Sequence, residues 1–282
     1  HPEYRRQRQM CIRDRKISEF SMKDVSLANE LMETWDIDRP GVDVLEWAFG
    51  YLLKNKFIEQ RTTSDEFPKN LLIENDSGRA EVLLKGSAVE NLSLILRNGD
   101  IIKELRDEVD AFEYDLTIIG GSAKRSMSHD MIQYINSSIF VVNNFNKTID
   151  YKILLAVDDS PGTKKAVKYG VRVAQAFGIK VQIITVNEDD NSKEANKKSS
   201  ENASKMMRRC GVEAETKFEI GKPVDKIVEL AGEDHIIIMG ASTQSPIAKF
   251  FIGSKPLNVM QNSNCPISVS YTHLRAHETR TN

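Results

Sequence analysis

One spacing of glycine and hydroxyl residues in the last quarter of the chain could bind an anion. The tetrapeptide Gly240–Thr243 is followed by nine residues and then by Gly253 and Ser254. An apolar run at 235–239, typical of a buried parallel strand, precedes it, and Ser254 has the residue type of a helix N-cap. Backbone N–H groups and the helix dipole would both point at a ligand held there. The spacing therefore predicts a phosphate-binding loop.

The segment that must position this loop alternates between strand and helix patterns. Apolar runs predict strands at 152–157, 181–186, 212–220, 236–239 and 265–269. Helical periodicity predicts helices at 161–177, 191–210, 223–231 and 254–260, with Ser160 and Pro161 as a start signal and Gly178 as a stop. The second helix is expected to bury a thin seam, formed by Ala195, Ala203, Met206, Met207 and Cys210. This alternation predicts a doubly wound, Rossmann-like α/β fold with a parallel sheet.

The first half of the chain contains a degenerate copy of the same pattern. A predicted strand at 92–99, a helix ending at Val109 and a strand at 114–120 match the segments leading to Gly240, and residues 139–142 match the fifth strand. Between Gly120 and Val142 there is no room for the nine-residue spacer and no Gly-Ser pair, so no phosphate site is expected there. The chain is predicted to hold two tandem doubly wound parallel-sheet domains, the first incomplete.

The expected boundaries follow from these patterns. A degenerate domain is predicted at 16–142, a linker at 143–150 and a complete domain at 151–270. The end segments, 1–15 and 271–282, lack apolar periodicity and are predicted to be non-native tails that take no part in the fold. Residues 16–80 contain few recognisable secondary-structure signals, and the one element predicted there is an amphipathic helix at 40–57. Its core face is expected to comprise Val44, Trp47, Ala48, Tyr51 and Leu52.

Composition limits the function classes. The chain carries 39 Lys+Arg against 41 Asp+Glu, a poor electrostatic footprint for nucleic acid. Cys210 and Cys265, the cysteines outside the tails, form no Cys-x-x-Cys pair, which indicates a reducing cytoplasm and no metal site or disulfide scaffold. The longest apolar stretch, 42–53, is too short and too charged to span a bilayer. No nucleophile elbow, Walker motif or dinucleotide fingerprint occurs, so no catalytic residue is expected.

With these motifs, residues 151–269 resemble a universal stress protein domain, and residues from about 36 to 142 look like a decayed second copy. The resemblance rests on Val157–Pro161 after the first strand, on Gly221 before the third helix, and on the spacing from Gly240 to Ser254. In the ATP-binding branch of that family, the aspartate after the first strand and the backbone ending the second strand hold adenine and ribose. The implied cofactor-binding residues are Asp158, Val186, Met239, Gly240, Thr243, Gly253 and Ser254.

Two residues depart from the family pattern. Thr243 replaces its second glycine, and Asp159 stands where the family commonly has glycine. A non-glycine residue in left-handed backbone costs about 1–2 kcal/mol, or about five- to thirtyfold in affinity, so a weakened site is expected rather than an abolished one. Asp159 adds negative charge or helps to place Mg²⁺. Lys249 and Lys255 are close enough in sequence to neutralise phosphate.

The resemblance implies a cytoplasmic stress-response or regulatory protein that binds ATP or a related adenine nucleotide, alone or with Mg²⁺, without catalysis. The two repeats are expected to pair within the chain through strands 139–142 and 265–269, or the chain to form a homodimer, because family members commonly dimerise through that edge. One alternative is a nucleotide-free interaction module, such as the soluble regulatory part of a membrane transporter. Another is a transferase or hydrolase acting on an adenine nucleotide.

Overall fold

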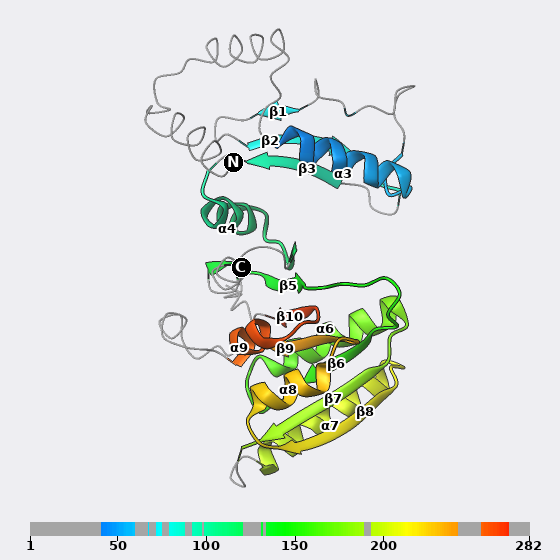
Figure 1. Cartoon of the computed structure of the whole chain (residues 1–282), viewed down its shortest axis with the longest axis vertical. Helices are drawn as coiled ribbons and strands as arrows, with labels where there is room; N and C mark the ends of the chain where they lie inside the picture. Colours follow the sequence, from blue (N-terminus) through cyan, green and yellow to red (C-terminus); the bar gives the residue numbers. More distant parts are fainter. Residues whose placement is uncertain are drawn as a thin grey trace, which may run out of the picture. The chain divides into compact units, whose positions relative to one another are not determined.

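The chain divides into two compact units, with the boundary between Asn98 and Gly99. A computed structural model describes residues 41–59, 67, 72–74, 79–87, 92–97, 99–120, 131, 134–188, 193–241 and 255–270 (Figure 1). None of the helices within these ranges is both long enough and apolar enough to cross a membrane. Both predicted tails lie outside the described residues.

The first unit combines one helix with a small antiparallel sheet. Its elements are α3 (Val42–Lys54), β1 (Ile73–Glu74), β2 (Arg79–Leu84) and β3 (Leu92–Arg97). Strands β2 and β3 pair along six residues, from Arg79 opposite Arg97 to Leu84 opposite Leu92. The helix and the sheet share a small apolar core around Val82, which is fully buried.

Two predictions for this unit were wrong. Residues 92–97 form a strand, but β3 pairs antiparallel with β2 and does not take the place of a third strand in a parallel sheet. The predicted face of α3 is also rotated, because Trp47 is 70% exposed whereas Val42 and Leu45 are buried. Val42, Leu45, Phe49 and Leu52 form a helical stripe as regular as the predicted one, and packing against the sheet selects it.

The second unit is built on a seven-stranded sheet with the order β4-β5-β10-β9-β6-β7-β8. Its strands are β4 (Leu116–Gly120), β5 (Ser138–Val142), β6 (Lys152–Ala156), β7 (Val181–Asn187), β8 (Ala214–Ile220), β9 (His235–Gly240) and β10 (Ile267–Ser270). All neighbours run parallel except β5 and β10, which pair antiparallel with Ile139 opposite Val269. This sheet confirms the predicted α/β fold class.

Helices cover both faces of this sheet (Figure 1). One face carries α6 (Thr163–Phe177) and α7 (Lys193–Arg209), and the other carries α8 (Pro223–Ala231), α9 (Lys255–Asn262) and α4 (Ile101–Phe112). Successive strand residues point to opposite faces, so Ile237 belongs to the α8–α9 core and Ile238 to the α6–α7 core. Both isoleucines are fully buried.

Several helix boundaries agree closely with the sequence signals, but α4 runs to Phe112, beyond its predicted end at Val109. Gly178 ends α6 with a left-handed φ of 64°, and Pro223 opens α8, as glycine and proline do at helix ends. However, α6 begins at Thr163 and not at Pro161. The turn before it is held by the Asp158 carboxylate, which accepts the Ser160 N–H at 3.1 Å.

The buried face of α7 also differs from the predicted seam. The buried residues are Asn196, Ser200, Ala203 and Met207, whereas Ala195 is exposed. Asn196 and Ser200 continue the helical stripe of Ala203 and Met207 at intervals of three and four residues. A search for apolar residues misses such a stripe because its first two members are polar.

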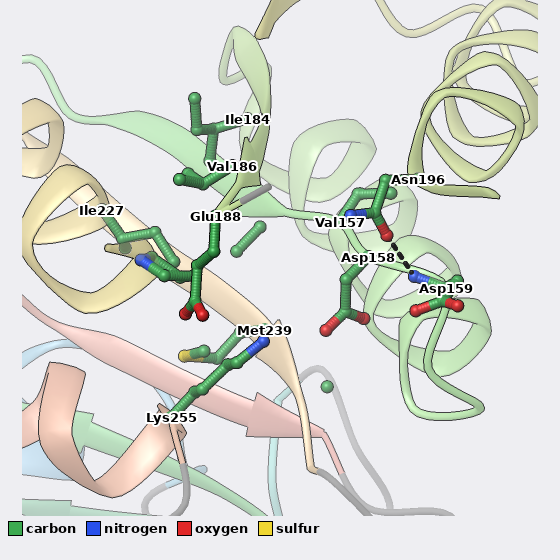
Figure 2. Close-up of a pocket in the computed structure, with 13 residues that line it drawn as sticks. Val157, Asp158, Asp159, Ile184, Val186, Glu188, Asn196, Ile227, Met239 and Lys255 are labelled. Carbon is green, nitrogen blue, oxygen red and sulfur yellow. Dashed lines mark hydrogen bonds between the residues drawn. The ribbon is translucent and has the colours of Figure 1, made fainter. Parts of the chain in front are cut away.

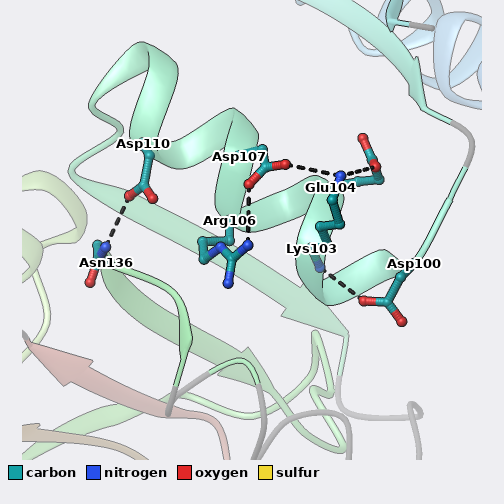
Figure 3. A network of polar contacts seen from close by, with 7 residues as sticks. All are labelled: Asp100, Lys103, Glu104, Arg106, Asp107, Asp110 and Asn136. Atoms are coloured by element: carbon teal, nitrogen blue, oxygen red, sulfur yellow. Dashed lines mark hydrogen bonds and ion pairs between the residues drawn. The ribbon is translucent and has the colours of Figure 1, made fainter. Parts of the chain in front are cut away.

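Residues 99–142 form only a partial copy of the complete domain. Elements α4, β4 and β5 follow one another as α8, β9 and β10 do, and β4 and β5 pair parallel as β9 and β10 do. Asp100 caps α4 by accepting the Lys103 N–H at 2.9 Å, and Asn136 donates to Asp110 at 3.0 Å just before β5 (Figure 3). The unit boundary thus falls inside the predicted first domain, and residues 143–150 connect two strands of one sheet.

Candidate functional site

A cavity of about 290 Å³ opens where β6, β7 and β9 end. Its volume is near the lower end of the range of about 300–1,000 Å³ typical of small-molecule sites. From β6 the chain passes through α6 to β7 on one side, and it later returns from β8 through α8 to β9 on the other side. The strand order reverses at this point, and such reversals are where ligands bind in open α/β sheets.

The structure brings four of the seven predicted site residues to this cavity. Asp158, Val186, Met239 and Gly240 all line it, and they come from three different strand ends. Thr243, Gly253 and Ser254 lie outside the described residues, so their contact with a ligand stays a prediction. The described wall divides into apolar side chains and charged or amide side chains. The apolar group includes Ile184, Val186, Ile227 and Met239, and the polar group comprises Asp158, Asp159, Glu188, Asn196 and Lys255.

Asp158 is fixed by the first turn of α6. Its Oδ1 accepts the Ser160 N–H at 3.1 Å and the Thr163 hydroxyl at 2.8 Å, and the Thr163 Oγ1 accepts the Asp158 N–H at 3.3 Å. None of these bonds involves Oδ2. Figure 2 shows the Asp158 carboxylate directed into the cavity. One oxygen therefore holds the loop, and the other can accept a hydrogen bond from a ligand.

Gly240 has a packing role that the sequence did not reveal. A Cβ built on Gly240 would overlap the backbone of Gly162, and a Cβ on Gly162 would overlap the backbone of Ala241. The loop before α6 and the end of β9 therefore approach each other backbone to backbone. Glycine is required at 240 for this close approach, whether or not a phosphate binds there.

Glu188 and Asn196 also line the cavity, although no sequence motif predicted them. Glu188 directly follows β7, and Asp158 lies just beyond the end of β6. A carboxylate just after a parallel strand is therefore the sequence signal that Glu188 shares with Asp158. Asn196 lies on α7 and is nine-tenths buried. Its Oδ1 accepts the Asp159 N–H at 3.0 Å, and its Nδ2 donates to Asn187 Oδ1 at 2.8 Å.

The charges of the described lining are unevenly distributed. Three carboxylates, those of Asp158, Asp159 and Glu188, come from the β6 and β7 side, and Lys255 comes from the start of α9. Figure 2 shows the side chains of Asp158, Glu188 and Lys255 pointing toward one another across the cavity. The Lys255 ammonium group and the positive end of the α9 dipole favour an anionic group on their side. The three carboxylates favour hydrogen-bond donors on the β6 and β7 side of the cavity.

The histidine of β9 lies at the opposite end of the strand from the cavity. His235 Nδ1 is 2.8 Å from Asp234 Oδ1 and 3.0 Å from the Ala231 carbonyl oxygen. Burial acts to raise the pKa of Asp234, but His235 and Lys152 lower it below its ordinary value. Burial also raises the pKa of the nearby Cys265 thiol to about 11, so this thiol is neutral. His235 thus has structural partners at this end of the sheet, and the cysteine beside them is unreactive.

In the described part of the chain, no three His, Cys, Asp or Glu side chains gather closely enough to hold a metal ion. A metal ion in the cavity would therefore need further ligands, such as the oxygen atoms of a ligand's own phosphates. Such an arrangement suits Mg²⁺ brought in with a nucleotide better than a metal held by protein alone.

Residues 151–270 match the family model of the Universal stress protein family. By this match, residues 151–270 form a universal stress protein domain. A search of curated proteins found no match.

Several solved structures are similar in part. A universal stress protein from Archaeoglobus fulgidus DSM 4304 is 20% identical, with 62% of this chain and 67% of that chain covered and a TM-score of 0.49. A putative universal stress protein from Pseudomonas aeruginosa UCBPP-PA14 is 13% identical, with coverages of 62% and 69% and a TM-score of 0.48. The universal stress protein from Archaeoglobus fulgidus in complex with dAMP is 23% identical, with coverages of 43% and 98% and a TM-score of 0.37.

Proposed function

We propose that the universal stress protein domain binds ATP or a related adenine nucleotide in the cavity and acts as a ligand-gated regulatory module without dedicated catalysis. The observation that carries this proposal is the two-sided chemistry of the cavity. A carboxylate and an apolar wall lie at one side, and a cationic side chain at a helix start lies at the other. A nucleotide has the same division into a purine with its ribose and a phosphate chain.

The base and ribose would lie on the β6 and β7 side. Ile184 and Val186 of β7, together with Met239 of the neighbouring β9, offer an apolar surface for a purine ring. The free oxygen of Asp158 would accept a hydrogen bond from a ribose hydroxyl or an adenine amino group, and charge-assisted bonds of this kind are stronger than neutral ones. Because Asp158 Oδ1 is already occupied, the acceptor is held in place before the ligand arrives.

The phosphates would extend toward α9. Lys255 begins this helix as the structure describes it, and its ammonium group would neutralise part of the phosphate charge. Thr243, Gly253 and Ser254, the predicted phosphate loop, complete the proposal on this side. Asp159 and Glu188 offer carboxylate oxygens of the kind that Mg²⁺ prefers, so Mg²⁺ is an optional partner of the nucleotide.

Calorimetric titration of the full chain with ATP and with adenosine, each with and without Mg²⁺, tests the proposal. One site per chain is expected. Gly253→Val should abolish ATP binding by placing a branched side chain against the phosphates, and Thr243→Gly should tighten it if backbone strain dominates. No heat and no thermal protection at millimolar ATP, with no rescue by Thr243→Gly, would overturn nucleotide binding. Turnover of bound ATP would contradict the absence of catalysis.

We also propose that β5 and β10 pair the partial first copy with the complete domain inside one chain, which makes a homodimer through this edge unnecessary. The antiparallel pairing of Ile139 with Val269 and of Val141 with Ile267 supports this. Free Cys210 and Cys265 support a place in the cytoplasm. Sedimentation equilibrium should show a monomer, and a stable dimer joined through the edge of β10 would contradict the proposed pairing.

A nucleotide-free interaction module is the second candidate, and one observation favours it. Val44, Trp47 and Tyr51 form an exposed apolar stripe on α3, and the two aromatic rings stack with their centroids 5.8 Å apart. Exposed aromatic side chains are enriched at protein interfaces. If ATP does not bind, a pull-down that is lost in Trp47→Ser would support this function instead.

A further inference from the structure

A buried amide side chain connects the cavity loop to two other elements. Asn196 of α7 accepts the Asp159 N–H through Oδ1 at 3.0 Å and donates through Nδ2 to Asn187 Oδ1 at 2.8 Å. Both asparagines are only 5% exposed. The Asn187 backbone carbonyl, at the end of β7, also accepts the Gly221 N–H at 3.0 Å. Asn196 therefore ties the loop after β6 to the junction of β7 and β8.

The orientation of the Asn196 amide follows from its partners. A backbone N–H can only donate, so the group that faces Asp159 must be the amide oxygen. The amide nitrogen then faces Asn187, whose oxygen must accept. Each amide thus has one arrangement that satisfies both hydrogen bonds: turning over the Asn196 amide would lose both, and turning over the Asn187 amide would lose the bond between the two asparagines. Because the Asn187 side chain fixes the orientation of the Asn196 amide, the Asn196 oxygen holds the Asp159 N–H in one position.

The loop that carries Asp158 is consequently held from both sides. Thr163 and Ser160 bond to Asp158 on the α6 side, and Asn196 bonds to Asp159 on the α7 side. Figure 2 shows Asn196 bonded to Asp159 while the adjacent Asp158 carboxylate points into the cavity. Removing the α7 contact would leave Asp159 attached only through its chain neighbours on that side, and the Asp158 carboxylate would be held only by its bonds to Ser160 and Thr163.

We propose that Asn196 is a positioning residue for the nucleotide site: it holds the loop 158–160 so that the Asp158 carboxylate meets the base and ribose side of the ligand. This inference rests on the proposed function. It explains why α7 buries the polar side chain of Asn196 at the start of its buried face. Asn196 acts on the Asp158 carboxylate indirectly, through its hydrogen bond to the backbone N–H of Asp159.

Ser200 provides a matched control. It lies one helical turn from Asn196 on the same buried face, and it is fully buried. Its Oγ has no hydrogen-bond partner among the residues that the structure describes, and it does not line the cavity. Ser200→Ala therefore disturbs the packing of α7 without touching the loop, whereas Asn196→Leu removes both amide bonds at similar side-chain volume.

The test measures affinities for ATP and for adenosine on the full chain by calorimetry, with a melting temperature for each variant. Asn196→Leu should weaken both ligands by the same factor, roughly tenfold, because the affected contact lies on the nucleoside side. Ser200→Ala should leave both affinities unchanged. In the Asp158→Asn background, Asn196→Leu should cause little further loss, since the carboxylate that it positions is already gone.

Three outcomes decide between the possibilities. If wild type binds neither ATP nor adenosine, the proposed function fails, and this inference fails with it, before any variant is made. If wild type binds but Asn196→Leu behaves like Ser200→Ala, or loses the same factor with Asp158→Asn present, the positioning role alone is overturned. Should Asn196→Leu not fold, Asn187→Leu replaces it. This variant keeps the bond between Asn196 and Asp159 but removes the partner that orients the Asn196 amide. An affinity loss smaller than tenfold but larger than that of Ser200→Ala supports the positioning role, and an affinity loss equal to that of Ser200→Ala overturns it.

Discussion

Strands β9 and β4 end with similar residues but have different surroundings. Both finish in glycine, at Gly240 and Gly120, and both carry isoleucine two residues earlier, at Ile238 and Ile118. Strand β9 lies between β10 and β6, whereas β4 is at the edge of the sheet. Ile238 is fully buried, and Ile118 is 62% exposed. The burial of a strand residue here depends on the neighbouring strand and helices more than on the strand itself.

The same difference explains where the cavity forms. Beside β9, the sheet contains β6, and the helices α6 and α9, which come after β6 and β9 in the chain, lie on opposite faces of the sheet. The reversal of strand order at β6 and β9 opens the cavity. Strand β4 has β5 as its only partner among the described strands. A strand that ends in glycine is therefore not enough to form the cavity. The cavity also needs the adjacent strand β6, which is followed by Asp158.

The largest expected effect concerns the core. Ile238→Ala should lower the free energy of unfolding by about 2–5 kcal/mol, because it removes buried methylene groups and leaves a cavity. Ile118→Ala, the matched change in β4, should alter it by no more than about 0.5 kcal/mol. Chemical denaturation of both variants measures the difference. Equal losses would show that β4 is covered as completely as β9.

A second pair of variants examines the two glycines. Gly240→Ala should destabilise the fold by about 1–3 kcal/mol, since its Cβ would overlap the backbone of Gly162. A Cβ on Gly120 meets no atom within 4 Å in the part of the chain that the structure describes, so Gly120→Ala should be close to neutral. The free energy of unfolding of each variant decides the matter. A neutral Gly240→Ala would mean that the close approach of the two loops is not required.

The third prediction concerns the acceptor that β6 supplies. Asp158→Asn keeps an oxygen for Ser160 and Thr163 but loses the charge, so affinity for ATP should fall roughly tenfold, as for the loss of a charge-assisted hydrogen bond. Asp234→Asn, at the opposite end of the sheet, is the control and should leave affinity unchanged. Isothermal titration of both variants would contradict a ligand contact at Asp158 if their affinities were equal.

A smaller effect is expected at the other side of the cavity. Lys255→Gln should weaken ATP about two- to fivefold while leaving adenosine unaffected, because a charge near a helix start contributes about 0.3–1 kcal/mol. Raising the salt concentration should reduce this difference. Lys197→Gln on the exposed side of α7 serves as the control. Equal weakening of ATP and adenosine would place Lys255 away from the phosphates.

The smallest effect should come from the ends of the chain. Removing 1–15 and 271–282 should leave the melting temperature unchanged, because these segments lack an apolar face that could offset about 1–2 kcal/mol of ordering entropy per residue. Differential scanning calorimetry compares the shortened and full chains. A fall of many degrees would show that one of the tails packs on the fold.

The sequence by itself determined the complete domain well, because its signals are local. Strand–helix alternation, the glycine stop at Gly178 and the proline start at Pro223 depend on residues close together in the chain, and the structure has these elements near the predicted positions. The resemblance also led to Asp158, Val186, Met239 and Gly240, since motifs after strands mark the ends of strands. Each of these residues lies at or just beyond the end of its own strand, and the ends of parallel strands meet at the same edge of the sheet.

Other features were decided by tertiary structure alone. Whether residues 92–97 join a parallel or an antiparallel sheet, and whether Trp47 or Leu45 faces the core, depends on partners distant in sequence. Asn196 became part of the site because the end of β7 and the loop after β6 meet its amide group, not because of any motif around it. Local sequence sets the periodicity and the ends of each element. Contacts between elements far apart in the chain determine which of the possible faces, partners and polar side chains are used.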